Sequence, residues 1–230
     1  MRDTDERVDG PTLVLGGTGK TGRRVVDRLA ARGVDVRVGS RSGAPPFDWN
    51  DRATWAPVLR GVSRMYVTYQ PDLAVPGAAE TVGALARLAV ESGVRRLVLL
   101  SGRGEEGARR AEDEVRTAGL EWTVLRASWF AQNFSENFLL NAVLAGEVAL
   151  PSGDVPEPFV DADDIADAAV AALTEKGHAG RVYELTGPRA LTFAQAVDEI
   201  ARASGRPIRF VPISAEAFLA GLRAEGLPGD

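Results

Sequence analysis

Gly16, Gly19 and Gly22 are spaced as G-x-x-G-x-x-G within the stretch LVLGGTGKTG. An apolar run of strand character precedes this loop, and apolar residues at helical spacing follow it. Glycines at this spacing permit a tight turn, a close approach of backbone to phosphate and a helix whose N-terminal N–H groups attract an anion. We therefore interpret the stretch as a loop that binds the pyrophosphate of a dinucleotide; the alternative is a turn without a ligand.

A phosphate-binding loop of the Walker A type does not fit this stretch. That motif requires G-x-x-x-x-G-K-[ST], and the residues at the required upstream spacing belong to the apolar strand. The cofactor-binding residues expected in the loop are Gly16, Gly17, Thr18, Gly19, Lys20, Thr21 and Gly22. Lys20 could contact phosphate or face solvent.

Ser40, Arg41 and Ser42 follow the second predicted strand and indicate which dinucleotide is bound. An NAD site has Asp or Glu at this place for the ribose 2′-hydroxyl, whereas an NADP site has Arg for the 2′-phosphate. Asp35 lies at the start of the strand, too early for that role. Arg41 could pair with a phosphate dianion while a serine hydroxyl donates to it, so the sequence predicts NADP(H). The alternative is a solvent-exposed arginine.

Two other groups of polar residues could suggest a metal site. Asp161, Asp163 and Asp164 lie close in sequence, but acidic residues before IADAAVAAL are also typical of a helix start. His178, the only histidine, lies in the apparent turn EKGHAG. We predict no metal site.

Composition limits the classes of function. The net charge of −5 argues against nucleic acid as the main partner, and the absence of cysteine excludes disulfides and a cysteine nucleophile. No apolar run approaches the roughly 20 residues that span a bilayer. Residues 1–10 are charged, have no signal-peptide character and are expected to form a flexible tail. The sequence predicts a cytoplasmic protein whose partner is a small molecule rather than nucleic acid or a membrane, and leaves open a monomer or a homodimer.

Strand-like and helical patterns alternate along the first 150 residues, which is typical of a doubly wound parallel sheet. Strands are expected at 12–16, 34–40, 65–69, 95–102 and 121–126, with helices after the glycine loop, at 74–91 and at 105–118. The last third of the chain mixes both kinds of element. A loop at 150–158 is followed by a helix and then by a strand at 181–187. A second helix begins at Thr192 with the capping box TFAQ, and a strand at 207–213 and a helix at 214–225 follow it. We expect an α/β fold with a Rossmann-type core at 11–150 and a smaller, mixed lobe at 151–230.

Together these motifs resemble the NmrA-like members of the atypical short-chain dehydrogenase/reductases. The residues that carry the resemblance are LVLGGTGKTG (13–22), VGSRSG (38–43), VRRLVLLSG (94–102), LEWTVLRASWFAQNF (120–134), EPFVDADDIADAAVAAL (157–173) and VYELTGPRALTFAQA (182–196). FDWNDRATWAPVL (47–59) and ASWFAQNF (127–134) look most like the branch of ergot-alkaloid reductases. The resemblance implies a Rossmann fold, NADP(H) and a small lobe over the substrate. It also implies that Asp48 and Trp49 border the adenine, and that Thr68, Tyr69 and Gln70 lie on the nicotinamide side.

The Tyr-x-x-x-Lys pair of short-chain reductases is absent from the chain. Gln70, Leu73 and Gly187 stand four residues after the three tyrosines. Reduction of a ketone creates an alkoxide and benefits from a general acid, whereas reduction of an iminium requires no proton at that step. An enone or a quinone lies between these cases because delocalisation spreads the charge. The missing pair therefore favours an activated acceptor.

Candidate catalytic and substrate residues follow the carboxyl ends of strands, where open α/β folds bind ligands. Tyr69 could donate a proton, and Ser101 could hydrogen-bond a reacting group or only its own backbone. Trp129, Phe130 and Asn133 could form an aromatic wall with one polar contact, or could only pack. We predict an NADPH-dependent reductase of an iminium, enone or quinone. Alternatives are a non-catalytic NADP(H) sensor and an isomerase or cyclase.

Overall fold

The computed structural model describes residues 10–136 and 139–224. The expected N-terminal tail therefore lies, except for residue 10, outside the described residues. The chain forms two compact units. Unit 1 comprises Met1–Ala127 and Ala162–Leu185, and unit 2 comprises Ser128–Asp161 and Thr186–Asp230.

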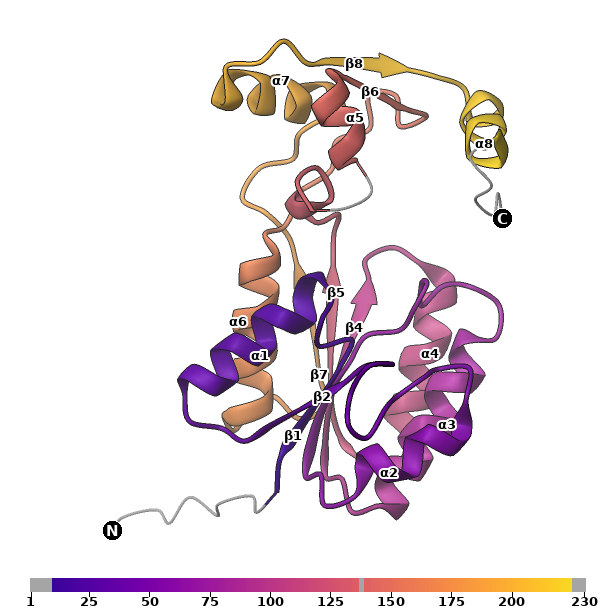
Figure 1. The fold of residues 1–230 in the computed structure, drawn as a ribbon, viewed down its shortest axis with the longest axis vertical. Helices are drawn as coiled ribbons and strands as arrows, with labels where there is room; N and C mark the ends of the chain where they lie inside the picture. The colour runs from indigo at the N-terminus through magenta and orange to yellow at the C-terminus, as the bar shows by residue number, and fades with distance from the viewer. Residues whose placement is uncertain (1–9, 137–138, 225–230) are drawn as a thin grey trace. The chain divides into compact units, whose positions relative to one another are not determined.

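Unit 1 is built on a six-stranded parallel sheet with the order β2-β1-β3-β4-β5-β7 (Figure 1). The strands are β1 (Thr12–Leu15), β2 (Val36–Gly39), β3 (Arg64–Val67), β4 (Arg96–Gly102), β5 (Glu121–Ala127) and β7 (Arg181–Leu185). In this register Leu15 lies beside Gly39 and Ser101 lies beside Arg126. The predicted Rossmann-type fold is confirmed.

Helices cover both faces of this sheet, as Figure 1 shows. Helices α1 (Lys20–Ala31) and α6 (Ala162–Thr174) pack on one face, and α2 (Trp55–Leu59), α3 (Ala78–Glu91) and α4 (Glu106–Thr117) pack on the other. Successive strand side chains point to opposite faces. In β1, Leu13 and Leu15 belong to the core under α2, α3 and α4, and Val14 belongs to the core under α1 and α6. A sheet covered on both faces explains why its strands read as continuous apolar runs.

The boundary between the units differs from the single boundary expected near residue 150. The chain leaves unit 1 after Ala127, returns at Ala162 for α6 and β7, and leaves again after Leu185. Strand β7 pairs in parallel with β5, and α6 packs against α1 through Ala166, Ala169 and Val170. The apolar pattern of RVYEL suits either unit, so only the pairing decides that this strand completes the Rossmann sheet.

Unit 2 combines short helices with a two-stranded parallel sheet. Its elements are η2 (Ala131–Asn133), α5 (Leu140–Ala145), β6 (Glu147–Leu150), α7 (Phe193–Ser204), β8 (Arg209–Pro212) and α8 (Ala215–Ala224), with β6 paired to β8. The capping box predicted at Thr192 is confirmed, since Thr192 and Gln195 hydrogen-bond each other's backbone. Phe134 is buried in the core of this unit, against Phe159 and Phe193. The sequence did not predict α5 and β6, which are too short for a clear period.

No helix in the described part of the chain has both the length and the apolar character needed to cross a bilayer.

Candidate functional site

The glycine loop joins β1 to α1 in a conformation that depends on its glycines. Gly16 has a φ of +67°, and its N–H donates to the carbonyl of Gly39 at the end of β2. The Gly19 N–H donates to the Gly16 carbonyl at 2.8 Å, which closes the turn. A Cβ on Gly22 would collide with that same carbonyl, and one on Gly16 would collide with the Thr68 hydroxyl. Side chains at these positions would therefore force the loop, the helix and the sheet apart.

Helix α1 begins directly after this loop with its N-terminus open to an anion. Its N-cap is Gly19, which has no side chain to accept from the first N–H groups, and no acidic residue lies in the first turn. Backbone donors and the positive end of the helix dipole therefore face the loop. This arrangement fits the pyrophosphate of a dinucleotide.

A cavity of about 190 Å³ lies beside the loop in unit 1. Its lining comes from the loop, from the end of β2 with the segment that follows it, and from the segment after β3. The residues are Gly16, Thr18, Gly19, Gly39, Ser40, Arg41, Phe47, Asp48, Trp49, Asn50, Thr68 and Gln70. The structure thus brings together residues predicted from three distant motifs. Gly39, Phe47 and Asn50 were not predicted, although each is next to a predicted residue.

Arg41 brings a positive charge to this cavity. Its side chain is exposed and, within the described residues, forms no ion pair or hydrogen bond. Ser40 lines the cavity with it, and the Ser40 and Ser42 hydroxyls lie 3.4 Å apart. Asp35 lines a different cavity, together with Pro11 and Arg37. The end of β2 therefore offers a cation and hydroxyls to a ligand, which suits a phosphate.

An aromatic cluster supports the other side of the cavity. Trp49 lies 4.9 Å from Tyr69 and 5.0 Å from Phe47, measured between ring centroids. Trp55 donates its indole N–H to the Asp48 carbonyl at 2.8 Å. Tyr69 therefore packs beside a residue expected at the adenine, and it does not line the cavity itself. Its role as a proton donor stays a prediction.

The remaining predicted loop residues lie outside the lining of the cavity. A Cβ on Gly17 would lie 2.9 Å from the Val38 side chain, so this glycine allows the loop to pack on β2. Lys20 is the first residue of α1. The buried Thr21 hydroxyl accepts from the Tyr66 hydroxyl of β3 at 3.1 Å. Burial raises the pKa of Tyr66 well above its ordinary value, so this phenol stays protonated and can donate.

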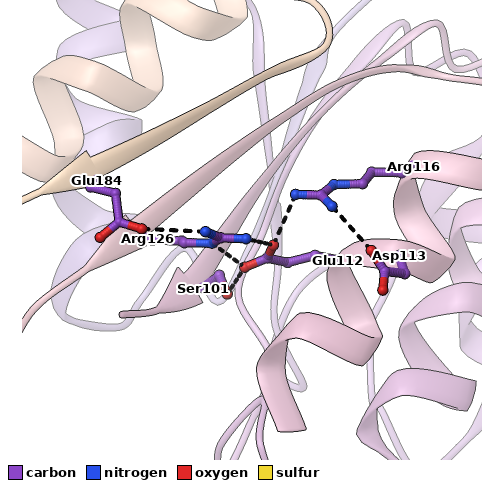
Figure 2. A network of polar contacts seen from close by, with 6 residues as sticks. All are labelled: Ser101, Glu112, Asp113, Arg116, Arg126 and Glu184. Atoms are coloured by element: carbon purple, nitrogen blue, oxygen red, sulfur yellow. Dashed lines mark hydrogen bonds and ion pairs between the residues drawn. The ribbon is translucent and has the colours of Figure 1, made fainter. Parts of the chain in front are cut away.

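Ser101 belongs to a buried network of polar side chains (Figure 2). It does not line the cavity. Its hydroxyl donates to Glu112 Oε1 of α4 at 2.7 Å, and the Glu112 side chain is 0% exposed. Arg126 of β5 binds both oxygens of this carboxylate, at 2.9 and 2.7 Å, and Arg116 adds a contact of 3.2 Å. Ser101 thus has a structural partner that the sequence did not predict, and its catalytic role stays a prediction.

The network explains how a carboxylate can be buried at this place. Burial by itself raises the pKa of Glu112, but hydrogen bonds from Arg126 and Ser101 outweigh it and hold the pKa below its ordinary value. Each arginine has a second acidic partner, since Arg126 contacts Glu184 at 3.2 Å and Arg116 contacts Asp113 at 3.1 Å. Figure 2 shows these residues joining α4 to the carboxyl ends of β4, β5 and β7.

The substrate candidates lie in unit 2. The Trp129 ring stands edge-on to Phe193 with centroids 5.0 Å apart, and its backbone N–H donates to Glu157 Oε1 at 3.0 Å. Phe130 precedes η2 and forms a β-bridge with Val160. Asn133 ends η2, and its carbonyl accepts from the Leu139 N–H. Trp129 is 36% exposed, and Phe130 and Asn133 are half-buried.

Two of the three aspartates considered as metal ligands, Asp161 and Asp163, have other side-chain contacts. Asp163 and Asp164 lie in the first turn of α6, and Asp163 pairs with Arg24 and Arg28 of α1 at 2.9 and 2.8 Å. Gln132 donates to Asp161. In the described parts of the chain, no group of three or more His, Cys, Asp or Glu side chains could hold a metal ion. His178 contacts the Tyr183 hydroxyl at 2.9 Å.

The parallel sheet, the glycine loop and the open N-terminus of α1 define a Rossmann-type dinucleotide-binding protein. A family model described as NAD(P)H-binding matches residues 16–176. The chain belongs to this family, and NAD(P)H is the cofactor that the loop and cavity fit.

Individual relatives agree with this assignment. The chain is 35% identical to the (4-alkanoyl-5-oxo-2,5-dihydrofuran-3-yl)methyl phosphate reductase of Streptomyces griseus, over 94% of this chain and 82% of the relative. It is 30% identical to the agroclavine dehydrogenase of Claviceps fusiformis, over 95% of this chain and 82% of the relative. The structure of an NADPH-dependent quinone oxidoreductase of Escherichia coli has the same fold, with a TM-score of 0.77 and 24% identity. The match covers 95% of this chain and 84% of that structure's chain. The predicted branch and the prediction of an NAD(P)H-dependent oxidoreductase are confirmed.

Proposed function

We propose that this oxidoreductase uses NADPH to reduce a small activated acceptor, namely an iminium, an enone or a quinone, without a Tyr-x-x-x-Lys pair. The preference for NADPH over NADH is supported mainly by the position of Arg41, which lines the cavity beside the glycine loop together with Ser40. No acidic residue stands at the end of β2 to prefer a 2′-hydroxyl. NADPH supplies the hydride when it is bound.

The acceptor class follows from the missing general acid. An acceptor that delocalises or neutralises charge as it is reduced needs less help from a proton donor. The names of the relatives are compatible with this idea, since one names a furanone with a conjugated double bond, one a clavine alkaloid and one a quinone.

Roles of individual residues are part of the proposal. Asp48 and Trp49, which line the cavity, would border the adenine. Thr68, Tyr69 and Gln70 would lie on the nicotinamide side. In unit 2, Trp129, Phe130 and Asn133 would contact the acceptor. The contacts of Trp49 with Tyr69 and of Asp48 with Trp55 support a fixed wall at the adenine.

Steady-state reduction of quinones, enones and cyclic iminium salts, followed by NADPH consumption, tests this proposal. Arg41→Ala should raise the KM for NADPH about 10- to 100-fold, because a charge-assisted contact to phosphate contributes about 1.5–3 kcal/mol. The KM for NADH should not change. Arg110→Ala is the matched control, because Arg110 is exposed on α4 and forms no ion pair with the described residues.

Two results would contradict the proposal. Equal affinity of the wild type for NADH and NADPH would remove the role of Arg41. Tight NADPH binding without turnover of any acceptor in the panel would instead favour the non-catalytic sensor.

A further inference from the structure

Trp129 presents part of an indole at the surface of unit 2. It is 36% exposed, while its edge-on neighbour Phe193 is 6% exposed and packs in turn against Phe159 at 5.1 Å and Phe134 at 6.2 Å. Buried aromatic rings therefore hold the indole from one side. Among aromatic side chains, indole offers the best face to a cation.

Glu157 places a carboxylate next to the backbone of Trp129. Its Oε1 accepts from the backbone N–H of Trp129 at 3.0 Å. The backbone of Glu157 is fixed in both directions by Leu191, with N–H to carbonyl distances of 2.8 and 3.0 Å. Within the described residues Glu157 forms no ion pair, and its Oε2 has no hydrogen-bond partner. One carboxylate oxygen is therefore held beside Trp129 and remains available to a ligand.

The surrounding segment contains no basic residue to compete for this carboxylate. Residues 128–161 include no lysine or arginine, although the chain has 27 basic residues, and they include Glu136, Glu147, Asp154, Glu157 and Asp161. Glu147 is neutralised by Arg209 of β8. This segment therefore contributes no positive charge that could pair with Glu157.

We propose that Trp129 and Glu157 form a binding site for a planar organic cation, so that the acceptor is an iminium-type cation rather than a neutral enone or quinone. The inference rests on the proposed reduction and selects among its acceptor classes. The indole would stack on the π-system of the cation, and the carboxylate would neutralise its charge.

The charge balance of the reaction predicts how Glu157 acts. The iminium carbon gains a hydride and forms a C–H bond, while the C=N π electrons move to nitrogen and give a neutral amine; no proton is consumed. NADPH is oxidised to NADP⁺ in the same step. Because the positive charge disappears from the acceptor, Glu157 attracts the substrate more than the transition state or the product. Glu157 should therefore lower both KM and kcat, so that its removal raises both.

Binding can be measured without cofactor or turnover. We would titrate the full chain at pH 7.5 with N-methylquinolinium and with its neutral analogue quinoline, using calorimetry. The wild type should bind the cation more tightly, and Glu157→Gln should weaken the cation about fivefold while leaving quinoline unchanged. Trp129→Leu should weaken both ligands, since it removes the stacking surface. Glutamine keeps the oxygen that accepts from Trp129, so the fold is retained.

Glu216→Gln is the matched control, because Glu216 is exposed on α8 and forms no ion pair with the described residues. In turnover, Glu157→Gln should raise the KM for an iminium acceptor about fivefold without lowering kcat, and it should leave the KM of any neutral quinone that is reduced unchanged. Equal affinity for the cation and quinoline, or equal effects of the two glutamine variants, would overturn the inference. A neutral quinone that is reduced with a lower KM than the iminium acceptor would overturn the inference and leave the proposed function intact, whereas cation binding without any turnover would remove the proposed function alone.

Discussion

Two networks of charged side chains hold the helices of unit 1, one on each side of the sheet. On one side Glu112 of α4 binds Ser101, Arg116 and Arg126, and its side chain is 0% exposed. On the other side Asp163 of α6 binds Arg24 and Arg28 of α1, and its side chain is 47% exposed. The contacts have similar lengths, so distance alone does not separate the two networks.

The two networks should differ in how much they contribute to the free energy of unfolding, because their carboxylates differ in exposure. Water can solvate Asp163 if an arginine is lost, and exposed pairs contribute about 0–1 kcal/mol. Glu112 has no such substitute, and removal of one partner from a buried pair leaves uncompensated charge. We therefore expect the α4 network to stabilise the carboxyl ends of β4 and β5 more than the α1–α6 pairs stabilise their side of the sheet.

Replacement of Glu112 should have the largest effect. Glu112→Ala should lower the free energy of unfolding by about 3–5 kcal/mol, because Arg116 and Arg126 lose a shared buried partner. Chemical denaturation followed by circular dichroism measures this change. Glu114→Ala on the same helix is the control, since Glu114 pairs with Arg87 at 39% exposure and should cost less than about 1 kcal/mol. Equal losses in the two variants would contradict the comparison.

The same carboxylate predicts a dependence of stability on pH. The pKa of Glu112 is lowered in the folded state, so its contribution is present above the ordinary pKa of 4.5 and is lost as pH falls through the lower folded value. The difference in unfolding free energy between wild type and Glu112→Gln should therefore stay constant from about pH 7 to pH 5 and shrink below it. Denaturation at a series of pH values measures it. A difference that grows on acidification would show that the folded pKa is raised instead.

The sequence predicted the parts of the site that lie close along the chain. The glycine loop and Ser40-Arg41 each follow a strand end, so local spacing was enough to identify them, and the cavity unites them. The Glu112 network was not predictable, because Ser101, Arg126 and Glu184 come from three strands whose order only pairing establishes. Such partners leave no periodic signal in the sequence.

The division into units was missed for the same reason. A short strand such as β7 carries the same apolar pattern whether it joins β5 or a separate lobe. Glu157 was missed as a neighbour of Trp129 because 28 residues separate them and the contact is to backbone. In each case a long-range contact, not a residue preference, determines the structure.

Replacement of Tyr66 should have an effect on stability that is intermediate between those of Glu112 and Asp163. Tyr66→Phe removes a buried hydrogen bond to Thr21 in the first turn of α1, so we expect a loss of about 1 kcal/mol in stability. Because that turn follows the glycine loop, part of this loss should appear in cofactor binding, and the dissociation constant for NADPH should rise about two- to fivefold. Equilibrium binding by NADPH fluorescence measures it. Tyr183→Phe, which removes a contact to His178, should leave NADPH affinity unchanged, and an equal change in both variants would show that the effect is not local.

Replacement of Asp163 should have the smallest effect. Asp163→Asn keeps the shape of the side chain and removes its charge, while Arg28 retains a second partner in Asp167. The loss should be below about 1 kcal/mol at 0.05 M NaCl and smaller still at about 0.5 M, because salt screens exposed pairs. Denaturation at the two salt concentrations measures it. A loss as large as that of Glu112→Ala, or one insensitive to salt, would mean that exposure does not distinguish the two networks and that the α1–α6 pairs also hold the sheet together.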